Sequence, residues 1–208
     1  MIYELYGDLR SGAFCVEAAL AEAGAPYAFR EIVLDRNEQK SQAFLALNPS
    51  GKVPALRLPE GIVLTETSAL LTIIAERHPE CGLLPPSGSI AQAEALRWLA
   101  FMASEIYPMV EVDDYPERFA PSGAAAEALK GKARARIRER MLIVEAAVKG
   151  RWLLGDTFCA ADIYAAMFTR WSYFRDWKEE HLPRICALAE ALAVRPKIAP
   201  VWKRHFGS

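Results

Sequence analysis

Two neighbouring stretches carry the strongest signal in this chain: NPSGKVPAL at residues 48–56 and LTETSAL at residues 64–70. The first predicts a loop that enters a strand through a Val-Pro pair, and the second predicts a strand followed by an apolar helix. A cis bond before the proline would leave the N–H and C=O groups of Val53 free to pair with an extended peptide. Glu66 and Thr67, at the helix N-terminus, would form a site for a carboxylate. We therefore expect a site for a small peptide with an amino-acid head.

The composition predicts a globular chain of one or two domains. Of the 208 residues, 52% are hydrophobic and 25% are charged, and the net charge is −1. Without a basic run, we expect no nucleic-acid partner and no anionic-membrane partner. The longest apolar runs contain charges or prolines, which is not typical of a membrane span, and the N-terminus lacks the regions of a signal peptide. These observations indicate a cytoplasmic protein.

The spacing of the cysteines argues against structural disulfides, a zinc site and a redox-active cysteine pair. They are widely spaced, with no C-x-x-C pair and no histidine pairing, at Cys15, Cys81, Cys159 and Cys186. This pattern is not typical of a disulfide framework, a zinc site or a dithiol redox centre. We therefore expect no metal and a reducing compartment.

Residues 1–78 predict a small α/β domain with a mixed sheet. Strand patterns alternate with helix patterns in the order βαβ–α–ββα. The expected strands cover 2–6, 27–34, 53–58 and 62–65, and the expected helices lie between Ser11 and Gly24, at 37–47 and at 68–77.

Residues 79–89 are rich in proline, serine and glycine and predict a linker, and residues 90–208 predict a domain made only of helices. The expected helices cover 91–107, 122–149, 160–174, 183–194 and 196–206, with Pro108 kinking or ending the first of them. The helix at 160–174 is apolar on nearly all sides, so we expect it to be the buried central helix. The acidic stretch at 113–117 is expected to be a solvated loop.

Four motifs in this arrangement resemble those of the cytosolic glutathione transferases. They are LYG at residues 5–7 with Ser11-Gly12, the loop at 48–54, ETSAL at 66–70 and GDTFCAAD at 155–162. The resemblance covers essentially the whole chain. It implies the glutathione transferase fold, in which an α/β thioredoxin-like N-terminal domain precedes an all-α C-terminal helical domain.

Two positions depart from the family pattern. Thr67 stands where the family usually has serine, which keeps the hydroxyl, and Cys159 stands where serine or threonine is preferred. A thiol caps a helix poorly, so Asp162 is expected to carry more of the capping of the buried helix.

The resemblance names glutathione as the peptide, and its sulfur then needs a hydrogen-bond donor. A free thiol titrates near ~8.5, and lowering that pKa by about two units takes roughly 2.7 kcal/mol. One charge-assisted hydrogen bond and a helix N-terminus supply about that much. Ser11, directly before the first helix, is the preferred donor, and Tyr6, at the end of the first strand, is the alternative. Ser11 could also be a plain helix cap.

Cys15 lies one helical turn beyond Ser11 and has two interpretations. A glutathione-linked disulfide there would suit thiol-transfer chemistry. A buried structural cysteine is the preferred interpretation.

The remaining groups of glutathione have expected partners. The Val53 backbone next to Pro54 would pair with the cysteinyl unit, and Lys52, with Lys40 as a weaker partner, would meet the glycyl carboxylate. Glu66 would accept from the γ-glutamyl ammonium group, and Thr67 with the helix N-terminal amides would hold its carboxylate.

The second substrate is expected to lie against an aromatic wall of the helical domain. The candidate pocket residues are Arg10, Trp98, Met102, Glu105, Tyr107 and Trp171, with Phe101, Tyr173 and Phe174 nearby in sequence. For each of these residues taken singly, packing in the helical core is the preferred interpretation, because aromatic residues at helical spacing fill bundles, and for Arg10 a loop cation is preferred.

The resulting hypothesis is a glutathione transferase in which glutathione is the co-substrate and its thiolate attacks a small hydrophobic electrophile. The alternatives are ether cleavage, dehalogenation, isomerisation or thiol transfer on the same scaffold, and a non-catalytic binding protein. The resemblance also implies a homodimer.

Overall fold

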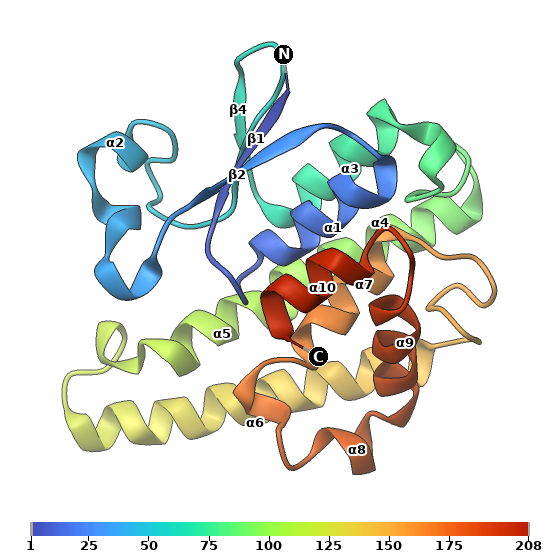
Figure 1. The fold of residues 1–208 in the computed structure, drawn as a ribbon. Coiled ribbons are helices and arrows are strands. Elements are labelled where there is room, and N and C mark those ends of the chain that lie inside the picture. The colour runs from blue at the N-terminus through green and yellow to red at the C-terminus, as the bar shows by residue number, and fades with distance from the viewer. Residues whose placement is uncertain (1, 208) are drawn as a thin grey trace.

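The N-terminal domain is built on a four-stranded mixed sheet (Figure 1). The computed structural model describes residues 2–207, and the strand order is β2-β1-β3-β4, with β1 and β2 parallel and the other pairs antiparallel. The elements of this domain are β1 (Tyr3–Gly7), α1 (Ala13–Ala23), β2 (Tyr27–Glu31), α2 (Gln42–Leu45), β3 (Ala55–Arg57), β4 (Val63–Thr65) and α3 (Thr67–Arg77). The predicted order of elements and the parallel pair are thus confirmed.

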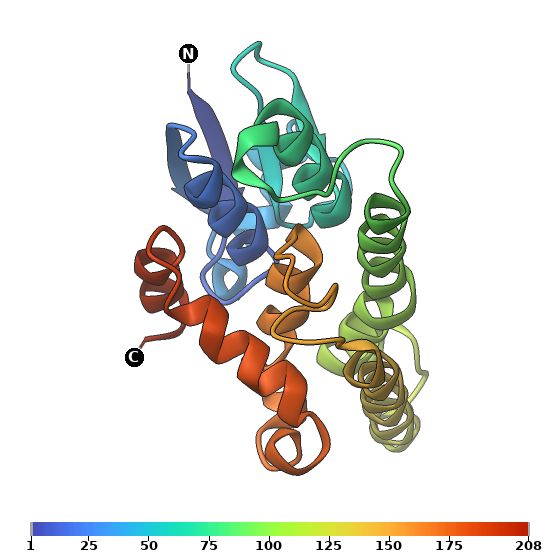
Figure 2. The same cartoon turned by 90° about the vertical axis from the view of Figure 1, so that its right-hand side faces the viewer.

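The rest of the described chain is helical. After a 3-10 turn at Pro79–Cys81, the helices are α4 (Ile90–Phe101), α5 (Tyr107–Asp114), α6 (Gly123–Ala147), α7 (Ala160–Phe168), α8 (Lys178–His181), α9 (Pro183–Ala193) and α10 (Ala199–Phe206). Figure 2 shows these helices below the sheet domain, with α10 returning to lie near the first strands. None of the helices within residues 2–207 combines the length and the apolar composition that crossing a membrane requires.

Alternation along β1 decides which side chains reach the helices. Tyr3 and Leu5 are buried, whereas Glu4 and Tyr6, between and after them, are only half-buried. Successive side chains of a strand point to opposite faces of the sheet. Because α1 packs against β1, α3, α7 and α10, the face that carries Leu5 belongs to the core, and Tyr6 lies on the other face.

Helix α7 is the centre of the molecule, as predicted from its apolar sequence. All nine of its residues are buried, and it packs against α1, α3, α4 and α9. The carboxylate of Asp162 accepts hydrogen bonds from the N–H groups of Cys159 (2.8 Å) and Leu153 (2.7 Å). The expected capping role of Asp162 is therefore present, and burial raises its pKa to about 6.

The strand expected at 27–34 ends at Glu31, with a 3-10 turn at Leu34–Arg36, and three predicted helices also differ clearly from those observed. The helix expected at 37–47 consists of a 3-10 turn, Glu38–Lys40, and the four-residue α2. The helix expected at 160–174 ends at Phe168, and a 3-10 turn follows at Ser172–Phe174. The helix expected at 91–107 passes through a π-helical turn, Met102–Ile106, and continues as α5 to Asp114. Pro108 has no N–H and its ring crowds the preceding turn, and the π-turn absorbs that misfit instead of ending the helix.

Candidate active site

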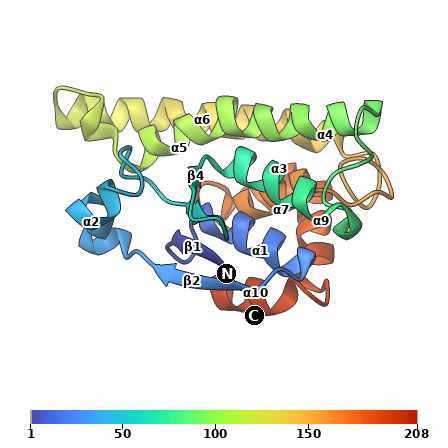
Figure 3. The same ribbon diagram turned by 90° about the horizontal axis from the view of Figure 1, so that it is seen from above.

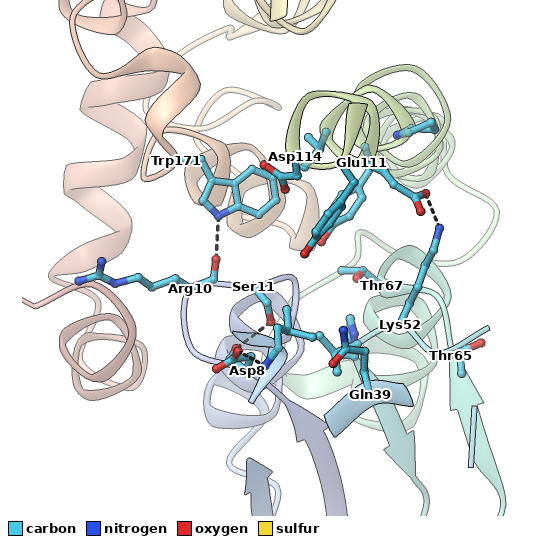
Figure 4. A pocket seen from close by; sticks show the side chains of 18 of the residues that line it. Asp8, Arg10, Ser11, Gln39, Lys52, Thr65, Thr67, Glu111, Asp114 and Trp171 are labelled. Carbon is cyan, nitrogen blue, oxygen red and sulfur yellow. Dashed lines mark hydrogen bonds and ion pairs between the residues drawn. The ribbon is translucent and has the colours of Figure 1, made fainter. Parts of the chain in front are cut away.

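A cleft of about 690 Å³ lies between the sheet domain and the helical domain (Figure 4). One wall comes from the loop after β1, the loops before β3 and α3, and the segment 34–40, which contains two 3-10 turns. The other wall comes from α5, α7 and the segment after α7. The cleft thus collects residues from both domains.

Ser11 lines this cleft immediately before α1. Its hydroxyl donates to the backbone oxygen of Asp8 (2.7 Å), and it accepts from the N–H of Ala13 (3.1 Å). The carboxylate of Asp8 in turn accepts from the N–H groups of Leu9 and Leu34, both at 2.8 Å. Ser11 is therefore a helix cap whose proton is shared with a neighbouring carbonyl, and rotation about its Cα–Cβ bond would release that proton toward the cleft.

Three segments meet at Gly12, the residue after Ser11. A methyl group at this position would lie 2.8 Å from the hydroxyl oxygen of Tyr107, 3.2 Å from Oγ1 of Thr67 and 3.4 Å from Cδ of Pro54. Only glycine leaves room for so close an approach. Burial raises the pKa of Tyr107 above its ordinary value, so its hydroxyl stays protonated and can donate a hydrogen bond to a ligand beside the α1 N-terminus.

The loop before β3 supplies the strand edge that the sequence predicted. The Val53-Pro54 bond is cis, and both residues line the cleft. Lys52 reaches across the cleft to Glu111 of α5, with Nζ and Oε2 2.6 Å apart (Figure 4). Nζ of Lys40 donates to the backbone oxygen of Gly51 (3.2 Å), so both lysines lie at the same end of the site.

Glu66 and Thr67 form the start of α3 and line the cleft. Glu66 is exposed and has φ of +69° and ψ of +107°, a conformation that residues with a side chain rarely adopt. Backbone strain of this kind persists where the surroundings dictate it and is concentrated at functional sites. Thr67 is buried, with 8% of its surface exposed. The pair is thus held at the position where a carboxylate and an ammonium group could be bound together.

The opposite wall is aromatic and acidic. Tyr107 and Trp171 line it as expected, and Nε1 of Trp171 donates to the backbone oxygen of Arg10 (2.7 Å). Tyr173 donates to Oδ1 of Asp114 (2.5 Å), and burial raises the pKa of Asp114. The wall also contains Val110, Tyr115, Arg118 and Tyr164.

The acidic stretch at 113–117, expected to be a solvated loop, is so only in part: Asp114 and Glu117 are exposed, whereas Asp113 is not. Asp113 is buried and forms a two-pronged ion pair with Arg134 at 3.0–3.1 Å, and Asp114 faces the cleft. Helix α5 extends to Asp114, which places Asp113 against Arg134 of α6 and Asp114 in the lining of the cleft. A prediction that placed the helix end at Pro108 could not find them.

Four predicted site residues lie outside the cleft. Trp98 and Met102 are buried in the core of the helical domain, and Glu105 pairs with Arg140 (3.0 Å). Tyr6, on the sheet face away from α1, donates to Glu4 (3.2 Å). The sequence predicted these four side chains to lie in the site, and in the structure they make contacts elsewhere.

Arg10 reaches the cleft through its backbone, while its side chain points toward α10 (Figure 4). Nε of Arg10 donates to the backbone oxygen of His205 (3.3 Å). The guanidinium group therefore does not face the aromatic wall that was expected to bind the second substrate.

Cys15 is fully buried, and burial raises the pKa of its thiol. Its sulfur lies 3.4 Å from the sulfur of Met167 on α7. The structure thus supports the interpretation of Cys15 as a packing residue. Within residues 2–207, no group of three or more histidine, cysteine or carboxylate side chains is arranged to hold a metal ion.

The sheet domain, the helical domain and the cleft between them define a glutathione transferase architecture, and comparison with known proteins gives the same result. Residues 13–77 match the family model for the N-terminal domain of glutathione S-transferases, and residues 91–196 match the model for their C-terminal domain. The chain belongs to the glutathione S-transferase family.

Individual relatives extend this likeness over nearly the whole chain. A glutathione S-transferase of Escherichia coli O157:H7 is 29% identical over 185 residues, covering 86% of this chain and 87% of the relative. A maleylacetoacetate isomerase of Pseudomonas aeruginosa is 35% identical over 109 residues, covering 51% of each chain. The crystal structure of a glutathione transferase homologue from Sulfitobacter with bound glutathione superposes with a TM-score of 0.91 at 27% identity and covers 99% of both chains.

Proposed function

We propose that this chain binds glutathione in the cleft between its domains and activates it as a thiolate for attack on a hydrophobic electrophile. The observation that carries the proposal is the convergence of Ser11, the cis Val53-Pro54 edge and the Glu66-Thr67 corner on one cleft. Glutathione bound in the Sulfitobacter homologue supports the choice of ligand.

Each group of glutathione has a partner in this proposal. The cysteinyl unit pairs with the Val53 backbone, and the γ-glutamyl carboxylate is held by Thr67 and the N-terminal amides of α3. Glu66 accepts from the γ-glutamyl ammonium group. Lys52, supported by Lys40, meets the glycyl carboxylate at the end of the cleft where Lys52 now pairs with Glu111.

The Ser11 hydroxyl is the proposed donor to the sulfur. It exchanges its acceptor, the Asp8 carbonyl, for the thiolate, and the thiol proton passes to solvent. The N-terminus of α1 adds a favourable field for the anion. The thiolate then forms a bond to the electrophilic carbon as the leaving group departs or the double bond opens.

The aromatic wall formed by Tyr107, Tyr115, Trp171 and Tyr173 suits an apolar second substrate. The protonated Tyr107 hydroxyl, beside the start of α1, is placed to donate to negative charge that develops on that substrate. Kinetics with aryl halides, aryl ethers, epoxides and maleyl compounds would identify the class of electrophile. A preference for maleyl compounds would favour isomerisation, the activity named for the Pseudomonas relative.

Steady-state kinetics with variants test the assignment of the donor. Ser11→Ala should lower kcat/KM by about 100-fold, the usual cost of removing one donor to a developing anion. Tyr6→Phe is the control, because Tyr6 lies on the other face of the sheet, and its activity should match that of the wild type. The proposal would be contradicted by the reverse ranking or by the absence of glutathione binding at millimolar concentration.

The proposal includes a homodimer, as the family resemblance implies, and a location in the cytoplasm, as the composition and the cysteine pattern indicate. Sedimentation equilibrium would measure the mass in solution. A monomer at micromolar concentration would contradict this part and leave the assignment of the cleft intact.

A further inference from the structure

The backbone of Arg10, one residue before Ser11, is held from two sides by the C-terminal domain. Its N–H donates to Nδ1 of His205 (3.2 Å), and its C=O accepts from Nε1 of Trp171 (2.7 Å). Arg10 has φ of +63°, a left-handed conformation that is unfavourable for a residue with a side chain. Such a conformation needs external support, and these two hydrogen bonds provide it.

His205 is itself fixed by the N-terminal domain. Helix α10 lies alongside α1 and β2 (Figures 2 and 3), and only 2% of the surface of His205 is exposed. Its ring lies 5.4 Å from the ring of Phe14 on α1 and 6.1 Å from the ring of Phe29 on β2, both edge to face. The rings of Phe14 and Phe29 therefore hold the imidazole in one orientation.

The polar edge of the ring is equally constrained. Nε2 of His205 lies 2.8 Å from a carboxylate oxygen of Glu17, a residue of α1 that is 1% exposed. Glu17 also accepts from the hydroxyl of Tyr27 (2.8 Å) and pairs with Arg204. Every hydrogen-bonding atom of the imidazole thus has a partner in the N-terminal domain.

These contacts determine the tautomer. Nδ1 accepts a backbone N–H, so it has no proton, and Nε2 carries the proton that it donates to Glu17. Burial, together with the neighbouring Arg204, lowers the pKa of His205 to about 4. The ring is therefore neutral at pH 7, and Nδ1 remains an acceptor.

We propose that His205 is a positioning residue for Ser11: its Nδ1 fixes the Arg10 N–H and thereby holds Ser11 where its hydroxyl, once turned from the Asp8 carbonyl, reaches the glutathione sulfur. His205 does not line the cleft and acts through Arg10. The proposal rests on the proposed function of Ser11. It assigns a role in catalysis to α10, an element some 190 residues away from Ser11 in the sequence (positions 199–206 against 11).

Two amide substitutions separate the hydrogen bonds made by the two ring nitrogens of His205. In His205→Asn, the side-chain oxygen can replace Nδ1 as the acceptor for Arg10, while the donor to Glu17 is lost. In His205→Gln, the side-chain amide can replace Nε2 as the donor to Glu17, while the acceptor for Arg10 is lost. Each variant removes one hydrogen bond and replaces the buried ring with an open-chain amide. Both variants should therefore show a lower Tm than the wild type in thermal unfolding.

The readout is the pH titration of the thiolate absorbance of glutathione bound at saturation, without electrophile. We expect His205→Gln to raise the thiolate pKa by about one unit and to lower kcat by about tenfold, since small misplacements of a catalytic group have effects of this size. His205→Asn should titrate as the wild type does. An unchanged titration in His205→Gln, or equal shifts in both variants, would overturn the proposal.

Trp171→Phe provides an independent test that leaves the buried imidazole in place. It removes the donor to the Arg10 carbonyl and should raise the thiolate pKa in the same direction. No shift in this variant, together with no shift in His205→Gln, would show that Ser11 is oriented without the Arg10 backbone. A wild-type protein that forms no thiolate would instead contradict the proposed function itself.

Discussion

At the scale of single residues, Lys52 pairs with Glu111, a partner that the glycyl carboxylate of glutathione would have to replace. Its ammonium group pairs with Glu111 at 2.6 Å, and the two side chains are 62% and 30% exposed. A pair this exposed contributes about 0–1 kcal/mol. Glu111→Gln should therefore lower the KM for glutathione by up to about fivefold, because Lys52 is then available to the glycyl carboxylate. Lys52→Gln is the matched control and should raise that KM.

A rise in KM for Glu111→Gln would contradict this account and would indicate that Glu111 itself binds glutathione. Isothermal titration with glutathione alone would show the same ranking as the kinetics. It would also separate binding from turnover.

Gly12 is the residue at which the close approach of the two domains can be tested. A methyl group there would lie 2.8 Å from the Tyr107 hydroxyl, so Gly12→Ala should lower the free energy of unfolding by about 1–3 kcal/mol, the usual cost of overpacking. Gly131→Ala is the control, since Gly131 lies within α6 with no atom near its Cβ position. That change should stabilise the protein by about 0.5–1 kcal/mol. Equal effects in denaturant unfolding would contradict the close approach.

Sequence reasoning located residues that belong to contiguous motifs and missed those that tertiary packing brings in. Ser11, Val53 and Glu66 were found because each lies in a short pattern tied to a strand end or a helix start. Asp114 was missed because it reaches the cleft only through the length of α5, and no local pattern distinguishes it from a surface residue. Tyr173 was among the aromatic residues considered for the wall, and the turn after α7 brings it into the cleft.

At the scale of secondary-structure elements, the cap of α7 is the feature that the sequence predicted most directly. Asp162 accepts from two buried N–H groups, at Cys159 and Leu153. Asp162→Ala leaves both without a partner and should lower the free energy of unfolding by about 2–5 kcal/mol. Cys159→Ser should raise it by about 0.5–1 kcal/mol, since a hydroxyl caps a helix better than a thiol does. Destabilisation by Cys159→Ser in urea unfolding would contradict this view of the cap.

The contact between α10 and α1 makes stability depend on pH. The pKa of His205 is about 4 in the folded protein, against 6.5 for the unperturbed group. Between these values the unfolded chain binds a proton that the folded protein does not, so stability is complete above pH 6.5 and is lost as the pH falls toward 4. The loss attributable to this group is about 3 kcal/mol.

His205→Asn removes this titration. The difference in unfolding free energy between the wild type and His205→Asn should therefore shrink as the pH is lowered from 7 to 4 in urea titrations. A constant difference would show that His205 has an ordinary pKa in the folded protein.

Helix boundaries were predictable where a cap, a glycine or a proline marks them, as at the start of α9 at Pro183 and the end of α3 before Pro79. The end of α1 at Gly24, with φ of +66°, was found from the sequence. The π-turn at Met102–Ile106 was not, because it depends on how α4 and α5 pack against α6 and α7 and on the relief of strain at Pro108.

At the scale of the whole molecule, the active site is a product of domain packing. The α/β domain supplies the candidate contacts to glutathione, and the helical domain closes the cleft and holds the loop before Ser11 through Trp171 and His205. The order of elements and the division into an α/β part and a helical part followed from sequence patterns. The return of α10 to β2 (Figure 3) did not, since long-range packing of this kind leaves no periodic signal.

The most direct test of the central claim is the pH titration of bound glutathione by its ultraviolet thiolate absorbance in the wild type and in Ser11→Ala. We predict a thiolate pKa about two units below the free value near 8.5 in the wild type, and a value close to that of free glutathione in Ser11→Ala. A low thiolate pKa that persists in Ser11→Ala and disappears in Tyr6→Phe would contradict the account.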